Sequence, residues 1–237
     1  MTIDLDDAGR EALRRASIAA KPWWYSPWLH LAGSFGLASM IAVLAVRSAR
    51  GVSALELLTV PVVYLLCNAI EWKAHKDLLH RRVPPLGMFY DRHAEVHHRV
   101  FVHHDMALRS AHELGFILIP WYGGVGVFVI TLPITIALDH FVGRNVAALF
   151  VATCMAYIVS YEGLHLAYHL PEESVIGRLR VIRILREHHR THHRAELSER
   201  WNLNVTVPVW DVLLGTRWRE GREASPAAAP GRKTLPG

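Results

Sequence analysis

The sequence predicts an all-α membrane protein, with four transmembrane helices arranged as two hairpins. Four long apolar runs each approach the ~20 residues that a helix needs to cross a bilayer core. The links within the first pair and within the second pair of runs are short, whereas the segments before, between and after the pairs are long and rich in Lys and Arg. Together, the lengths of the runs and the uneven distribution of charge predict this fold class.

The composition agrees with a membrane protein. Hydrophobic residues make up 51% of the 237 residues, although the chain also carries 26 Lys and Arg, so apolar and charged residues are segregated. The basic pI of about 9.5 is explained by a one-sided distribution of charge in a membrane protein, and we expect no nucleic-acid partner. Both cysteines, Cys67 and Cys154, lie within apolar runs, where we expect them to pack between helices.

The first half of the chain contains a polar segment and the first hairpin. Residues 1–26 are expected to form a cytoplasmic N-terminal segment with a short surface helix, because acidic residues come early and basic residues late. The aromatic stretch PWWYSPW then suits a membrane interface. Apolar runs at 27–46 and 52–71 form the first predicted hairpin.

The second half contains two more apolar runs and a tail. The runs are at 114–138 and 145–163; the first of these contains Pro120 and Pro133, which a membrane helix tolerates when its neighbours satisfy the freed backbone groups. Residues 219–237 are rich in Ala, Pro and Gly and are predicted to be a disordered tail.

The orientation follows from the basic residues. Of the 26 Lys and Arg residues, only Arg47, Arg50 and Arg144 fall in the short links. The positive-inside rule therefore places the two termini and the 72–113 segment in the cytoplasm.

Histidine is the most over-represented residue type, with 16 copies, and most of them fall in the segments predicted to be cytoplasmic. Four groups have the spacing of metal ligands: an H-x4-H, an H-x3-HH, an H-x3-H and an H-x2-HH. Their members are His75 and His80; His93, His97 and His98; His165 and His169; and His189, His192 and His193.

These ten imidazoles predict a pair of metal ions. Helical residues three or four apart share a face, so three of the groups can each point at one place. His75 and His80 are five apart and need a frayed helix end or a bend. Neutral imidazole binds Zn, Cu, Fe and Ni, and ten rings are too many for one ion. Three histidines, His103, His104 and His188, stay undecided, with His188 expected outside the ligand set.

Arginines flank the last histidine group. Protonated rings would repel these arginines and one another, so the pattern favours neutral rings whose nitrogens bind a metal. We expect Arg186, Arg190 and Arg194 to help keep the rings neutral, because a nearby positive charge disfavours imidazolium.

The ordered motifs resemble those of the fatty acid hydroxylase superfamily, which includes sterol desaturases and carotenoid hydroxylases. The closing stretch WNLNVTVPVWDVLLGT, residues 201–216, is similar to the end of that family's domain. The resemblance covers about residues 30–218 and implies a hydroxylase-like membrane domain over 27–218. It also implies a helical cytoplasmic cap packed on the membrane helices, in which the ten histidines hold two Fe ions, with Zn possible in the isolated protein.

The resemblance further implies a reaction and partners. Members are non-haem di-iron oxygenases that use O2 and two electrons to hydroxylate or desaturate a lipid-like substrate. The substrate is expected from the bilayer. The electrons are expected from a separate ferredoxin, rubredoxin or cytochrome b5 type of donor with its reductase, because no part of this sequence resembles a cytochrome b5 domain.

Two questions stay open in the sequence. Ligating histidines usually donate their second N–H to a carboxylate or a carbonyl. Eight acidic residues are near enough in sequence to accept it, with the first two favoured: Glu71, Glu162, Asp77, Asp91, Glu95, Asp105, Glu187 and Asp211. The alternative function is a histidine-rich membrane protein that binds or transports metal without oxygenase activity. A carrier would be expected to place ionisable residues within its spans along the path of the ion, and the spans of this chain carry few of them.

Overall fold

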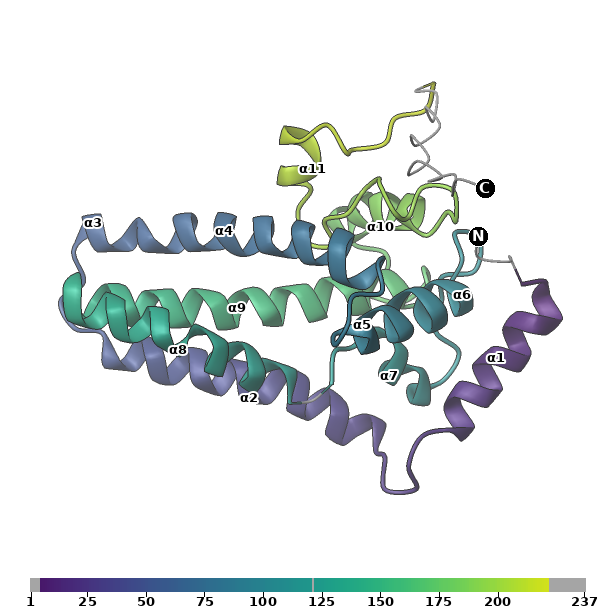
Figure 1. The fold of residues 1–237 in the computed structure, drawn as a ribbon, viewed down its shortest axis with the longest axis horizontal. Helices are drawn as coiled ribbons and strands as arrows, with labels where there is room; N and C mark the ends of the chain where they lie inside the picture. Colours follow the sequence, from purple (N-terminus) through teal and green to yellow (C-terminus); the bar gives the residue numbers. More distant parts are fainter. Residues whose placement is uncertain (1–4, 121, 222–237) are drawn as a thin grey trace, which may run out of the picture.

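A computed structural model describes residues 5–120 and 122–221, and these residues form helices and no β-strand. The greater part of the predicted disordered tail, residues 222–237, lies outside the described residues. Four helical segments of the described chain are long and apolar enough to cross a membrane. They lie side by side, and shorter helices gather at one end of the bundle (Figure 1).

The four candidate spans are close to the predicted runs. They are α2, Pro27–Ser48; the continuous segment Ala54–Leu79, which contains α3, Ala54–Leu57, and α4, Thr59–Ala74; α8, Gly123–Phe141; and α9, Arg144–His169. The connections from α2 to α3 and from α8 to α9 lie at the same end of the bundle, opposite the short helices (Figure 1).

The third span begins later than predicted. Residues 114–117 form a separate short helix, α7, Leu114–Ile117, and α8 starts only at Gly123. Leu118 leaves helical geometry and Pro120 follows, where a proline has no N–H to continue the helix. The apolar side chains of α7 therefore pack among the short helices at the end of the bundle, with Phe116 and Ile117 against Val100.

Helix α9 is the central helix of the bundle. It packs against α2, α4 and α8. More than half of its apolar window is buried inside the protein, at 56%, whereas the other three spans are buried by at most 17%. Met155 and Cys154 on α9 pack against Val63 on α4 and Ala38 on α2. The other spans expose their large apolar side chains, as expected for surfaces that face lipid.

The short helices form what we call the cap. They are α1, Asp7–Ala19; α5, Gly87–Arg92; α6, His98–Val100; η3, Ala111–Glu113; α7; and α10, Arg180–His192. A last short helix, α11, Val209–Leu213, lies instead beside α4, where the Trp210 indole N–H donates to the Leu65 carbonyl at 3.0 Å.

Helix α1 is held against the rest of the cap by its side chains. The Asp6 side chain caps its first turn by accepting the Gly9 N–H at 2.8 Å. The buried Arg14 side chain pairs with the buried carboxylate of Glu113. The predicted surface helix therefore belongs to the packed structure.

Candidate metal centre

Two π-helical turns set the first two histidine groups. The turns are η1, His75–Leu79, and η2, His93–His97. In η1 the His80 N–H donates to the His75 carbonyl at 3.2 Å, and in η2 the His98 N–H donates to the His93 carbonyl. An i→i+5 hydrogen bond places residues five apart above one another, so each pair shares a face. The bend expected at His75 and His80 is a π turn.

The other two groups stand on regular helices. His165 and His169 are one turn apart at the end of α9. His189 and His192 lie in the last turns of α10, and His193 caps that helix. Helices α9 and α10 contact each other, which brings these two groups together.

All ten predicted histidines converge on one buried region. Candidate ligand nitrogens within 4.8 Å of one another define three overlapping groups: His75, His80, His93, His98 and His192; His97, His165, His169 and His189; and His97, His98 and His193. The third group joins the first two, so the arrangement has two centres that share a boundary.

The distances between ring nitrogens suit ligands of one ion. In the first centre the Nε2 atom of His93 lies 2.9 Å from that of His75 and 3.1 Å from that of His98. In the second, the Nε2 atom of His97 lies 3.2 Å from that of His165. Nitrogens held about 2.1 Å from a transition ion and at right angles would be about 3.0 Å apart.

Main-chain carbonyls orient four of the rings through Nδ1. His75 donates to Leu203, His192 to Trp201, His193 to Phe101 and His169 to Met106, at nitrogen–oxygen distances of 2.5, 3.0, 2.6 and 2.7 Å. A neutral ring that carries its proton on Nδ1 has a lone pair on Nε2. All four rings therefore present an unprotonated Nε2 atom to the interior of the cluster.

Orphaned nitrogens show that the site suits a cation. His169 is fully buried, and its Nε2 atom has no hydrogen-bond partner although Nδ1 is used. His193 directs an unprotonated Nε2 atom at the Nε2 atoms of His97 and His189, 3.2 and 3.0 Å away. Lone pairs buried this way are costly unless a cation accepts them. The residues present therefore fit a bound transition-metal pair.

The rings are neutral because they are buried. Burial lowers the pKa of His193 to about 3, and burial with the neighbouring rings holds the pKa of His189 and of His192 well below 6.5. For these three rings, burial and the neighbouring imidazoles are the causes, rather than the arginines that the sequence led us to expect. The three groups contain histidine alone among the described His, Cys, Asp and Glu residues, a donor set that suits Fe, Zn, Cu or Ni better than Mg or Ca.

Comparison with known proteins agrees with this site. A family model described as "Fatty acid hydroxylase" matches residues 60–216, about two-thirds of the chain, and the match contains all ten histidines. The chain belongs to the fatty acid hydroxylase family. This family is part of the sterol desaturase/fatty acid hydroxylase superfamily. Neither the curated proteins nor the solved structures gave a match.

Membership of the hydroxylase family makes the chain an oxidoreductase of a membrane class that acts on lipids. The histidine-rich groups give it metal-binding character, and the four apolar helices fit an integral membrane protein. Which histidines bind metal stays a prediction, now made for ten side chains that the structure brings together.

Glu71 and Glu162 were predicted to accept the second N–H of ligating histidines, and the structure gives both residues a different role. Both are buried, and neither accepts a hydrogen bond from a ligand histidine. Glu71 accepts the N–H groups of Val205 and Thr206 and the hydroxyl of Tyr157. Glu162 accepts the Ile119 N–H at 3.1 Å. These carboxylates hold backbone segments, and four of the ring N–H groups use carbonyls instead.

The other acidic residues also miss the rings of the ten histidines. Five of them pair with basic side chains in the described chain: Asp77 with Lys73, Asp91 with Arg82, Glu95 with Arg99, Asp105 with Arg109, and Glu187 with Arg190. Asp211 is buried and accepts from the Leu203 and Asn204 N–H groups and from His188, whose Nε2 atom is 3.0 Å away. Asp211 thus holds the segment whose Leu203 carbonyl orients His75.

The three undecided histidines lie outside the cluster. His188 faces Asp211, and His104 contacts Arg10, with 2.9 Å between the His104 Nε2 and Arg10 Nη1 atoms. None of His103, His104 and His188 belongs to the three ligand groups. His103 and His104, which the sequence left undecided, are therefore not among the candidate ligands in the described structure.

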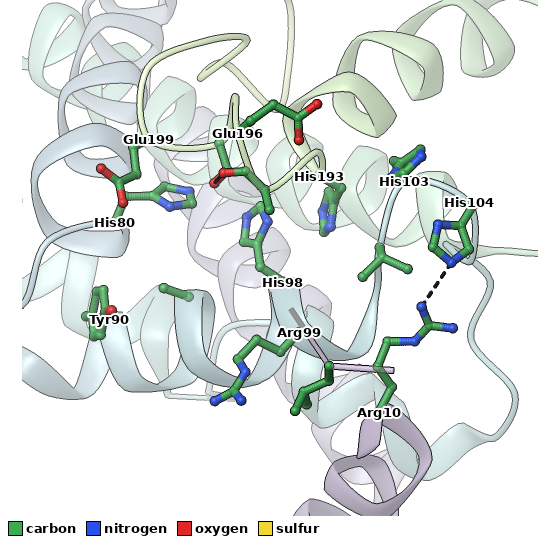
Figure 2. A pocket seen from close by; sticks show the side chains of 15 residues that line it. Arg10, His80, Tyr90, His98, Arg99, His103, His104, His193, Glu196 and Glu199 are labelled. Atoms are coloured by element: carbon green, nitrogen blue, oxygen red, sulfur yellow. Dashed lines mark hydrogen bonds between the residues drawn. The ribbon is translucent and has the colours of Figure 1, made fainter. Parts of the chain in front are cut away.

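A cavity of about 210 Å³ opens from the cap side onto this centre. His80, His98 and His193 line its inner part, and Tyr90, Glu196 and Glu199 lie around it (Figure 2). Three of the ten rings can thus be reached from outside the bundle by a small molecule.

Proposed function

We propose that this chain is a membrane-bound non-haem di-iron oxygenase that uses O2 and two electrons to hydroxylate, or desaturate, a lipid-like substrate. The observation that carries the proposal is the cluster of ten imidazoles, nine of them buried and four with an unprotonated Nε2 atom aimed inward, within a chain of the hydroxylase family. When bound, two ferrous ions supply the redox chemistry that activates O2 and oxidises a C–H bond.

The protein holds such a pair by dividing its histidines. His75, His80, His93, His98 and His192 would hold one ion; His97, His165, His169 and His189 would hold the other. We assign His193 to the second ion because its Nε2 atom lies 3.2 and 3.0 Å from those of His97 and His189. The main-chain carbonyls keep the rings in the tautomer that binds metal. Burial keeps them neutral, and the surrounding protein limits the access of water to the centre.

Small reactants have a route that avoids the bilayer. The cavity on the cap side reaches His80, His98 and His193, and its lining also includes the polar side chains of Tyr90, Glu196 and Glu199. We propose that O2 and protons enter here, and that a separate electron donor of the ferredoxin, rubredoxin or cytochrome b5 type docks on the same side. The distribution of Lys and Arg supports a cytoplasmic cap.

The substrate is proposed to come from the bilayer. Three of the four spans expose apolar side chains to lipid, and the metal centre lies at the end of these spans. Hydroxylation needs one C–H cleavage and desaturation needs two, so hydroxylation is the simpler assignment. A metal carrier is less well supported, because the buried Glu71 and Glu162 are engaged by backbone N–H groups and do not line a path.

The experiment combines metal content with lipid chemistry. The chain is produced with and without His189→Ala in iron-supplemented cells, and lipids are profiled by mass spectrometry. We expect a gain of one oxygen or a loss of two hydrogens in one lipid class with the unchanged chain alone, and about two metal ions per purified chain. Fewer than one ion per folded chain would overturn the di-metal assignment, and identical lipid profiles would overturn the activity.

A further inference from the structure

A second cavity, of about 160 Å³, lies where the end of α9 meets α10 and the 103–107 loop. It is separate from the ten-histidine cluster, because none of the ten rings lines it. Its charged lining comes from Arg186 and Arg190 on α10, from Glu172 after α9, and from Asp105; His103 and His104 also line it.

Arg186 is a buried cation with unused hydrogen-bond donors. Its side chain is 4% exposed. The Nη2 atom donates to the Ala167 and Leu170 carbonyls, at 2.9 and 3.1 Å, and so caps the end of α9. The Nε and Nη1 atoms are buried and have no hydrogen-bond partner. Glu172 does not satisfy them, because its carboxylate oxygen is 3.9 Å from Nη1.

Arg190, one turn further along α10, adds a second cation to the same cavity. Its Nη2 atom hydrogen-bonds Glu172, but its Nε atom is buried without a partner. Glu172 is therefore one partly exposed carboxylate shared by two guanidinium groups. The other carboxylate, Asp105, is engaged by Arg109 at 2.7 Å. The two guanidinium groups therefore share one available carboxylate, and the cavity has more hydrogen-bond donors than its own acceptors satisfy.

We propose that this cavity binds a phosphate-type oxyanion, with Arg186 and Arg190 as its donors. Guanidinium groups recognise phosphate through charge-assisted hydrogen bonds. The two arginines that carry the unpartnered donors both line this cavity of about 160 Å³. The anion would compete with Glu172 for Arg190. This site is independent of the proposed oxygenase activity.

Two sources could supply this phosphate. One is free inorganic phosphate. The other is a lipid headgroup, because α9 has 26 residues and a length of ~39 Å, whereas the bilayer core is ~30 Å thick. The end of α9, where the cavity lies, would then reach the headgroup layer.

Binding at this cavity would be visible as thermal stability. The site joins the end of α9 to α10. Helix α9 carries two of the ten clustered histidines, and α10 with its C-cap residue His193 carries three. An anion held between them stabilises the folded chain by mass action. The probe is inorganic phosphate, added to the purified full chain in an uncharged detergent, with sodium chloride at matched ionic strength as the reference.

Three variants distinguish phosphate binding in this cavity from a general effect of ionic strength. Arg190→Gln should raise the half-saturating phosphate concentration at least ~10-fold, as expected for the loss of one charge-assisted contact. Glu172→Gln should lower it, because the competing carboxylate is removed. Arg183→Gln, an exposed arginine on α10 that does not line the cavity, should leave it unchanged. Arg186 is left intact because it also caps α9.

A second arm identifies the source. The chain is placed in nanodiscs of phosphatidylcholine with or without phosphatidic acid, in buffer free of phosphate, and inorganic phosphate is then added to the discs that lack phosphatidic acid. A rise in melting temperature with phosphatidic acid that is lost in Arg190→Gln supports the lipid source; a response to free phosphate in the discs without phosphatidic acid supports the soluble source. Equal effects of phosphate and chloride, or an Arg190→Gln variant that responds like the unchanged chain in both arms, would overturn the site.

Discussion

The Nδ1 atom of His75 lies 2.5 Å from the carbonyl oxygen of Leu203, 128 residues further along the chain. This bond joins the end of the second span to the segment after α10. It fixes both the tautomer and the direction of the ring, so the position of Leu203 is a requirement of the metal centre. Glu71 and Asp211 hold that segment through its backbone N–H groups.

Glu71 should therefore be needed for stability and for metal content. Glu71→Gln replaces an oxygen that accepts from buried donors with an NH2 group, which leaves at least two donors without an acceptor. We expect a loss of at least ~3 kcal/mol, which corresponds to a fall in melting temperature of ~6–12 °C for a chain of this size. Glu173→Gln, the same change at an exposed position, should have little effect. A Glu71→Gln variant with normal melting temperature and normal metal content would contradict this role.

His188 and His189 should differ sharply although they are adjacent. His189 is buried with its Nε2 atom 3.0 Å from that of His193, whereas His188 faces Asp211. We expect His189→Ala to abolish product formation and to reduce bound iron, and His188→Ala to keep most of both. The two variants are compared at matched expression, with product and iron measured in the same samples. The reverse pattern would show that the ligand register of α10 is wrong.

The metal-free chain should lose stability in acid. Seven clustered rings outside the spans have a pKa lowered by burial: His80, His93, His97, His98, His189, His192 and His193. Unfolded rings take up a proton below about pH 6.5, whereas the folded rings stay neutral down to the lowered values, about 3 for His193. The unfolded state therefore binds more protons in this window, and stability falls as the pH falls, by up to ~1.4 kcal/mol per pH unit for each ring.

This pH dependence is measured as the melting temperature of chelator-treated protein between pH 7 and pH 5. Bound metal should raise the melting temperature at pH 7, because it binds the folded state alone, and the difference should shrink as protons compete for the rings. A melting temperature of the metal-free chain that does not change over this range would be inconsistent with buried neutral histidines.

The proposed orientation can be tested with single cysteines in a chain that lacks Cys67 and Cys154. A cysteine at Ala49 or Val142 should react with a membrane-impermeant reagent added outside intact cells, and one at Arg81 should react only after the membrane is opened. The positions lie at opposite ends of the spans. Labelling of Arg81→Cys from outside would reverse the orientation and remove the argument for cytoplasmic electron donors.

The sequence predicted the main architecture because long apolar runs and clustered histidines are signals carried by residue type. It missed features that depend on the backbone. The start of α8 was placed too early because the apolar run continues through Leu114–Ile117, which pack in the cap. Acidic residues were expected to orient the rings, but the acceptors are carbonyls such as those of Leu203 and Met106. Every residue has a carbonyl, so no residue type marks these positions.

The π turns at His75–Leu79 and His93–His97 have a consequence for how the chain can vary in length. Each turn accommodates one residue more than an α-helical turn, so removing one residue between His75 and His80 need not break the pair. Two histidines four residues apart on an ordinary α-helix would also point in nearly the same direction. Insertions and deletions at these two places are thus tolerated only when the helix type changes with them, and a search for relatives that demands one fixed spacing would discard chains with the same centre.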